Sequence, residues 1–207
     1  MTKPSAPSDA ELFRLSMAGD EPAFTALYQR HQGAVYRFAL LMSGQSSIAE
    51  EVTQEVFLAL LRNSNRYDPE RGSLSAYLCG AARNQVLRLL ERDRPYIQLV
   101  EEADEGEAVP LTRLIAGDDP LNDCVRKEAI KLVRQSVLAL PPRYREAIVL
   151  CDFLELSCAD AALALGCPVG TVNSRLHRGR VLLLKKLRAS ARIDSAVSDA
   201  EGMRCFA

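Results

Sequence analysis

The sequence has no tryptophan and only two histidines, His31 and His177, which lie far apart. Its six cysteines form no C-x-x-C pair: Cys79, Cys124, Cys151, Cys158, Cys167 and Cys205. A zinc site needs clustered His and Cys ligands, so we expect no metal and interpret the cysteines as buried or incidental free thiols. A triad-like grouping, a phosphate-binding glycine loop and a paired-carboxylate site are absent too. We therefore expect no enzyme, no cofactor and no small-molecule substrate.

Long hydrophobic runs are also missing. No apolar stretch approaches the roughly 20 residues of a membrane span, and the start, MTKPSAPSD, lacks the apolar centre of a secretory signal. We therefore expect a cytoplasmic protein with reduced thiols. Strand signals are nearly absent while helix signals recur, which predicts an all-α fold.

The first half of the chain predicts four helices. Capping boxes pair Ser8 with Glu11 and Ser47 with Glu50, and Gly19 and Gly44 break the pattern. The expected helices cover 9–18, 21–42, 48–63 and, after a turn-rich segment over 65–72, residues 73–93. Because these helices can bury a common core, we expect a helical-bundle domain over residues 1–94.

The composition then changes. Residues 95–123 carry many carboxylates against a single base, Arg113: Glu101, Glu102, Asp104, Glu105, Glu107, Asp118, Asp119 and Asp123. We interpret 95–119 as an acidic flexible linker. Helical spacing returns at Pro120, a helix is expected over 143–153, and a second small helical domain covers 120–188, before a tail over 189–207. The sequence thus predicts two small all-helical domains held apart by a negative tether.

The second domain ends in a helix-turn-helix pattern. Ser157 and Asp160 form a capping box, Gly166 can end the first helix in a left-handed conformation, and Pro168 suits the start of the next. In that second helix the apolar positions share one inward face: Val172, Leu176, Gly179 and Leu183. The side chains on its other sides can reach base edges and phosphates, among them Asn173, Ser174, His177 and Arg178.

Charge supports a DNA-binding function for this motif. No acidic residue occurs between Asp160 and Asp194, whereas seven basic residues do: Arg175, Arg178, Arg180, Lys185, Lys186, Arg188 and Arg192. The whole chain has a formal net charge of only −1, so the basic field is local. A solvated helix face is the alternative, but the turn chemistry and the inward apolar stripe favour DNA binding.

A second unusual helix face lies in the first domain. Glu51, Gln54, Glu55 and Leu58 share one side of the expected helix over 48–63. An acidic and amide-bearing face with one apolar neighbour suits a partner protein. The residues alone do not separate that interpretation from an ordinary solvated surface.

The sequence resembles a known family in both halves. AEEVTQEVFLALLRN and YDPERGSLSAYLCGAARNQVLRLLERDR resemble the first conserved domain of bacterial sigma factors of the extracytoplasmic-function (ECF) group. LPPRYREAIVLCDFLELSCADAALALGCPVGTVNSRLHRGRVLLLKKL resembles their second conserved domain, the promoter-binding helix-turn-helix. The matches have the right order and separation and cover about residues 10–94 and 120–188. One helix-turn-helix is weakly specific, but the pairing is strongly specific.

The resemblance implies functions for particular residues. Contacts to the clamp of core RNA polymerase would come from Glu51, Gln54 and Glu55. Recognition and melting of the −10 promoter element would fall to Arg71, Tyr77, Arg83, Asn84 and Arg88; family members commonly carry Trp at the position of Tyr77. Contacts to the −35 element would come from Thr171, Asn173, Ser174, Arg175, His177 and Arg178, with Arg175 and Arg180 on phosphates. For two of these residues a purely structural role is the alternative to DNA contact: Tyr77 could pack in the core, and the Asn84 amide could donate a hydrogen bond to a helix carbonyl.

The resemblance also implies partners. The acidic linker would pass through basic channels of the polymerase, although its composition alone would make it disordered. An anti-sigma protein would hold the factor inactive. The expected protein is thus a non-catalytic, dissociable polymerase subunit bound to promoter DNA. The alternative is a stand-alone helix-turn-helix regulator, which would have no use for the Glu51–Glu55 face.

Overall fold

The structure is a computed structural model that describes residues 7–62, 67–92 and 120–204, with side chains described over 128–189 in the last range. Every element within these ranges is helical, so the predicted all-α fold is confirmed. The expected acidic linker over 95–119 lies outside the described residues.

The first unit contains α1 (Asp9–Met17), α2 (Glu21–Ser43), α3 (Ser46–Arg62) and α4 (Leu74–Arg92). The Ser8 side chain accepts the Glu11 N–H and caps α1, as predicted. Gly44 ends α2 at φ +76°, a conformation that costs glycine little. The four helices pack around buried residues such as Leu27, Phe38, Val52 and Leu78.

The second unit contains α6 (Pro120–Leu138), α7 (Pro142–Ile148), the π-helix η2 (Val149–Phe153), α8 (Cys158–Leu165) and α9 (Val169–Arg204). The predicted helix-turn-helix is confirmed in α8 and α9, because Gly166 ends α8 at φ +62° and Val172 and Leu176 are buried. The expected helix over 143–153 is present, but its second half is a π-helix. A π-helix this short does not change the spacing of hydrophobic residues enough to be predicted from the sequence.

Two details of the sequence prediction are wrong. Helix α3 begins at Ser46, so Ser47 lies inside its first turn and is not the capping residue. At α8, the Ser157 hydroxyl accepts the Asp160 N–H at 3.0 Å. The Asp160 carboxylate, however, accepts the Ser157 hydroxyl at 2.7 Å rather than a backbone amide, so only half of that capping box forms.

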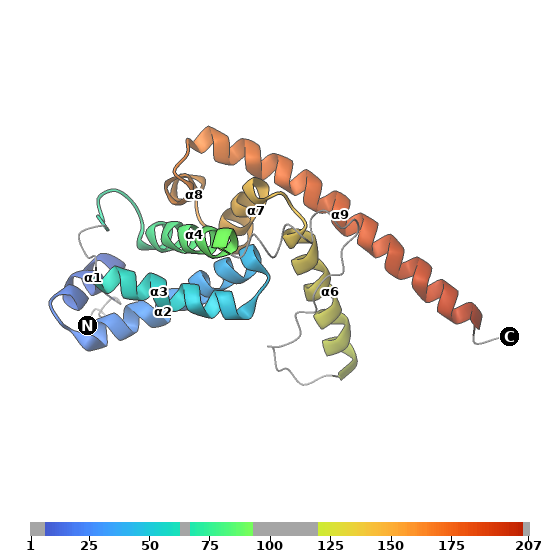
Figure 1. Ribbon diagram of the computed structural model, residues 1–207, viewed down its shortest axis with the longest axis horizontal. Helices are drawn as coiled ribbons and strands as arrows, with labels where there is room; N and C mark the ends of the chain where they lie inside the picture. Colours follow the sequence, from blue (N-terminus) through green and yellow to red (C-terminus); the bar gives the residue numbers. More distant parts are fainter. Residues whose placement is uncertain (1–6, 63–66, 93–119, 205–207) are drawn as a thin grey trace, which may run out of the picture.

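The two units are in direct contact, and the expectation that a tether holds them apart is wrong for this structure. Figure 1 shows α7 and α8 lying over α4, and one buried cluster joins Val86 of the first unit to Leu150, Ala161 and Leu165 of the second. The physical reason is that α8 has apolar residues on more than one face, which sequence spacing assigned to its own domain alone.

Arg145 on α7 reinforces this contact. Its guanidinium donates to the Met42 carbonyl at the end of α2 at 2.7 Å. It also donates to the carbonyl of Leu138, the last residue of α6, and to that of Leu140, two residues farther along. Burial lowers the pKa of Arg145, and the neighbouring Glu146 carboxylate opposes that shift. One half-buried cation therefore satisfies carbonyl groups from both units.

Candidate nucleic-acid interface

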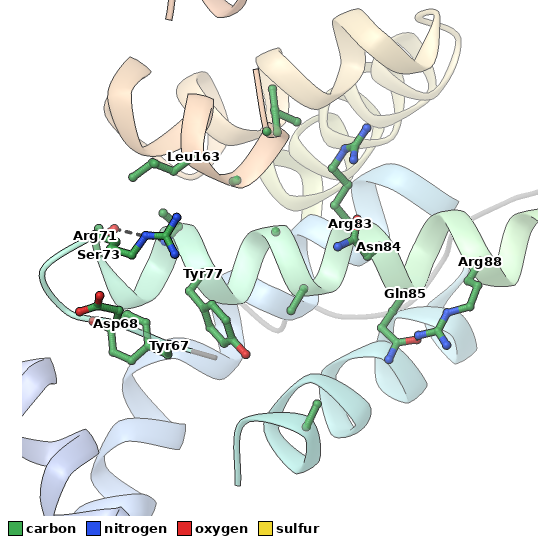
Figure 2. Close-up of a pocket in the computed structure, with 18 residues that line it drawn as sticks. Tyr67, Asp68, Arg71, Ser73, Tyr77, Arg83, Asn84, Gln85, Arg88 and Leu163 are labelled. Carbon is green, nitrogen blue, oxygen red and sulfur yellow. Dashed lines mark hydrogen bonds between the residues drawn. The ribbon is translucent and has the colours of Figure 1, made fainter. Parts of the chain in front are cut away.

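A cavity of about 590 Å³ lies between α4 and α8. All five residues predicted to read the −10 element line it: Arg71, Tyr77, Arg83, Asn84 and Arg88. Figure 2 shows these side chains along α4 and the loop before it, with Leu163 of α8 on the opposite side. The structure therefore brings together residues that the sequence grouped only by resemblance.

Two tyrosine rings meet at one end of this cavity. The ring centroids of Tyr67 and Tyr77 are 5.4 Å apart at a tilt of 48°, and Figure 2 shows the rings side by side. Tyr67 is buried, and burial together with the charges of Asp9 and Asp68 raises its pKa. Tyr77 packs against the core, as its structural alternative predicted, and also lines the cavity, while its contact with the −10 element stays a prediction. Sequence reasoning missed Tyr67, although it begins one of the segments that resemble the family.

The polar side chains on α4 differ from one another in exposure and in hydrogen-bond partners. Asn84 is exposed, and the Arg88 guanidinium donates to the Gln85 side-chain oxygen at 2.8 Å. Arg83 donates through Nε to the carboxylate of Glu146 on α7 at 2.7 Å, and the Glu146 side chain is only 4% exposed. No sequence signal links Arg83 to Glu146.

A second link joins the loop before α4 to α8. The Ser73 hydroxyl donates to the Asp160 carboxylate at 2.7 Å. Burial raises the pKa of Asp160, but hydrogen bonds from Ser73 and Ser157 outweigh it and leave that pKa below its ordinary value. The ionised form of Asp160 is thus the one that this contact stabilises.

The outer surface of α9 carries the residues predicted for the −35 element. Asn173, Ser174, His177 and Arg178 are exposed, and Thr171 and Arg175 are half-buried. The Ser174 hydroxyl donates to the Thr171 carbonyl at 3.0 Å. Arg180 forms a bidentate ion pair with Asp152, with Nη2 and Oδ1 2.6 Å apart. The guanidinium that was expected to bind a phosphate therefore binds a carboxylate in this structure.

The acidic face of α3 is open to solvent. Glu51, Gln54 and Glu55 are exposed. Leu58 and Leu61 are 40% and 41% exposed. Gln54 and Glu50 line a second hollow of about 400 Å³ together with Tyr28 and Tyr36 of α2. The face combines carboxylates, an amide and two exposed leucines, and its binding to a partner protein stays a prediction.

Among the described thiols, Cys151 and Cys158 lie close together, and burial followed by the charge of the neighbouring Cys158 raises the pKa of Cys151 to about 11. Cys79 is buried, which raises the pKa of its thiol to about 12. Cys151, Cys158 and Cys167 are free and half-buried, and Cys124 and Cys205 lie outside the described side chains. Over the same part of the chain, no group of three or more His, Cys, Asp and Glu side chains could hold a metal ion. None of the helices described is both long and apolar enough to cross a membrane.

Comparison with known proteins identifies the family. Residues 27–95 match the family described as Sigma-70 region 2, and residues 130–183 match that described as Sigma-70, region 4. The ECF RNA polymerase sigma factor SigW of Bacillus subtilis (strain 168) is 32% identical over 172 residues, which are 82% of this chain and 91% of SigW. The chain belongs to the ECF RNA polymerase sigma factors.

Two further comparisons agree. The ECF sigma factor SigM of Mycobacterium tuberculosis (strain ATCC 25618 / H37Rv) is 32% identical over 182 residues, with 87% of this chain and 85% of SigM covered. Among solved structures, CnrH in complex with the cytosolic domain of CnrY matches with a TM-score of 0.64 at 23% identity, over 88% of this chain and 99% of that one. This last likeness concerns the fold alone.

As an ECF sigma factor, the protein directs RNA polymerase core to promoters and takes part in transcription initiation. The two matched regions lie in the two helical units, in the order that the sequence predicted. A stand-alone helix-turn-helix regulator is the less supported alternative, because it does not account for the region 2 match.

Proposed function

We propose that this sigma factor reads the −10 element with α4 and the −35 element with α9, while the exposed face of α3 holds the polymerase clamp. In this proposal, residues 1–94 form the region 2-like domain and residues 120–188 the region 4-like domain, joined by the linker over 95–119 and followed by the tail over 189–207. The observation that carries it is the cavity along α4 that Arg71, Tyr77, Arg83, Asn84 and Arg88 all line.

At the −10 element the expected chemistry is capture of single-stranded DNA. Separated bases stack on aromatic rings such as Tyr67 and Tyr77, and arginines follow the phosphates. The Asn84 amide offers a donor and an acceptor to the edge of an extruded base. Because these groups bind the open strand better than the duplex, binding shifts the equilibrium toward melting without nucleotide hydrolysis. In this scheme no residue of the chain is a catalyst.

At the −35 element the expected chemistry is readout in the major groove. An α-helix fits that groove, where guanine presents two acceptors to an arginine and adenine presents a donor and an acceptor to an amide. Arg178 and Asn173 are exposed on the same helix as His177 and have the required groups. Arg175 and the basic residues farther along α9 supply phosphate contacts, which position the helix without reading sequence.

The polymerase-binding face gives the direct test of this function. A Glu51→Arg/Glu55→Arg variant reverses the charge of the exposed face of α3, so we expect capture of core RNA polymerase to fall by about tenfold or more, a change of about 1.4 kcal/mol. Pull-down of purified core polymerase by the tagged full chain measures it.

Glu91→Arg and Glu21→Arg/Glu91→Arg are the controls: both residues are exposed carboxylates outside α3, and the double control changes the net charge as much as the test variant does. Both controls should capture polymerase as well as the native chain does. Equal capture by the native chain, the test variant and the controls would exclude the α3 face as the clamp contact.

We also propose that an anti-sigma protein regulates the factor and that the factor acts in the cytoplasm, where the polymerase works. A co-crystal structure of the sigma factor RpoE in complex with the anti-sigma factor NepR from Bartonella quintana matches this fold with a TM-score of 0.57 at 24% identity, over 76% of this chain and 91% of that one. Co-purification of the chain from its native cells, followed by mass spectrometry, would identify such a partner.

A further inference from the structure

Two thiols lie close together where the helix-turn-helix begins. Cys151 belongs to η2, and Cys158 is the first residue of α8. Both side chains are half-buried. They pack against one small cluster of buried residues: Leu140, Ala147, Ile148 and Leu176. Burial raises the pKa of Cys151, and the charge of Cys158 and a side-chain hydrogen bond with it add to the shift, so the two sulfur groups are neighbours within one packed site.

The backbone between these cysteines is fixed by hydrogen bonds. The Leu154 N–H donates to the Val149 carbonyl at 3.0 Å. The Leu156 N–H donates to the Leu150 carbonyl, also at 3.0 Å. Between these two donors, Glu155 has φ +56°, a left-handed conformation that is uncommon for a residue other than glycine. The fold of this segment, and not a chance encounter of loops, therefore makes the two thiols neighbours.

A cation of α9 faces the same site. Arg180 forms an ion pair with Asp152, the residue after Cys151. Asp152 is the main cause of the raised pKa of Arg180, and the charges of Cys151 and Cys158 add to it. Burial dominates the pKa of Cys151, but the Arg180 charge opposes burial there. A thiolate formed at this site lies beside a positive charge, which is the environment of reactive cysteines.

We infer that Cys151 and Cys158 form a reversible disulfide, which links η2 to the first turn of α8 when the chain meets the disulfide of a small thiol. This site goes beyond the proposed function and uses none of the residues assigned to promoter or polymerase. In the cytoplasm proposed for this factor, thiols are kept reduced. The bond therefore forms when oxidised small thiols accumulate, and it opens when they are reduced again.

The exchange proceeds in two balanced steps. With its pKa raised to about 11, Cys151 is protonated at neutral pH, so Cys158 attacks first. The Cys158 sulfur bonds to one sulfur of the small disulfide, and the thiol that leaves takes up the proton that Cys158 loses. The Cys151 sulfur then attacks the Cys158 sulfur and releases the second small thiol, which takes up the Cys151 proton. Two protein thiols are oxidised, and one small disulfide is reduced to two thiols.

Thiol mapping of the full chain, with all its native cysteines, tests this disulfide. The chain is incubated with oxidised glutathione, unfolded in urea, alkylated with N-ethylmaleimide and digested with trypsin. One tryptic peptide, residues 146–175, contains Cys151, Cys158 and Cys167. Cys167 is half-buried like the pair, so it is a matched internal control. We expect the oxidised peptide to carry one label, on Cys167, and the peptide treated with dithiothreitol to carry three.

Two variants check which thiols are joined. Cys158→Ala should abolish the bond within this peptide, whereas Cys167→Ala should leave it unchanged. Three labels on the oxidised native peptide would overturn the inference. A bond to Cys167, or a glutathione adduct that persists on Cys151 or Cys158, would overturn it as well.

Thermal unfolding measures the link between η2 and α8. Calorimetry compares the oxidised and the reduced native chain with Cys158→Ala treated in the same two ways. We expect oxidation to raise the melting temperature of the native chain by about 2–6 °C, because the closed loop restricts the unfolded chain, and to leave that of Cys158→Ala unchanged. No rise, or an equal rise in both proteins, would contradict the link. Neither measurement uses DNA or polymerase, so its failure would leave the proposed function untouched.

Discussion

Three arginines on α4 and α9, the helices proposed to read DNA, differ in the partners of their side chains. Arg83 is paired with Glu146 and Arg180 with Asp152, whereas Arg178 extends from α9 into solvent. Under the proposed function, the first two would exchange a carboxylate for a phosphate when DNA binds. Arg178 needs no exchange, which makes it the clearest residue for testing base readout.

We expect Arg178→Ala to weaken promoter binding by about 1–3 kcal/mol and to relax preference at one position of the −35 element, because a bidentate contact to guanine is lost. Lys185→Ala, also on an exposed position of α9, should instead weaken binding to every sequence alike. Binding of the full chain to a library of −35 sequences distinguishes the two. A uniform loss of affinity for Arg178→Ala would mean that its contact is to phosphate alone.

The residues that sequence reasoning predicted share a property. Val172 and Leu176 were assigned to an inward face from helical spacing and are buried, and Glu51 and Gln54 were assigned to an outward face and are exposed. Spacing fixes such faces because the helix is regular. The Arg83–Glu146 pair was missed because its partners are 63 positions apart in sequence and depend on how two units meet.

At the scale of elements, the packing of α9 on α7 depends on a glycine. A Cβ on Gly179 would lie 2.9 Å from Ile148 Cγ1 and 3.3 Å from the Tyr144 carbonyl oxygen. The second of these atoms is backbone and cannot move alone. Gly170, near the start of the same helix, has nothing within 4 Å of such a Cβ.

We expect Gly179→Ala to lower the free energy of unfolding by about 1–2 kcal/mol, since overpacking outweighs the gain of up to about 1 kcal/mol in helix propensity. Gly170→Ala should leave stability unchanged or slightly raised, because it gains propensity without a clash. Urea denaturation followed by circular dichroism measures both. A stabilised Gly179→Ala variant would show that α9 and α7 can separate at no cost.

Element boundaries also show where sequence reasoning stops. Gly44 and Gly166 were correctly expected to end helices, because a left-handed residue has a chemical signature. The π-helix over Val149–Phe153 was not expected. Its one extra residue per turn changes the backbone hydrogen bonding. Over so short a segment, the spacing of hydrophobic residues does not reveal that change.

At the scale of the whole molecule, the two units share a hydrophobic core. Arg145 adds hydrogen bonds between them. Its guanidinium serves the Met42 carbonyl of the first unit and the Leu138 and Leu140 carbonyls of the second. Composition separated the chain correctly into two helical units, but it contained no information on their contact. That contact depends on tertiary packing of α8 against α4.

We expect Arg145→Met to destabilise the chain by about 1–3 kcal/mol, because buried carbonyls lose their donor while the buried volume is nearly kept. Thermal unfolding of the full chain by calorimetry measures it. Arg143→Met is the matched control: Arg143 is exposed and stacks 4.8 Å from the Tyr144 ring centroid, so its loss should cost under about 1 kcal/mol. Equal melting temperatures for the two variants would contradict the fastening role of Arg145.

The covalent path from Arg92, the end of α4, to Pro120, the start of α6, makes the meeting of the two units a unimolecular event. Joining the two units in one chain gives each an effective concentration at the other that does not depend on how dilute the protein is. Dilution therefore leaves the packing of α8 against α4 unchanged, whereas every external partner competes through its own concentration. The two units would thus pack together to the same extent in cells that make few copies of this factor and in cells that make many.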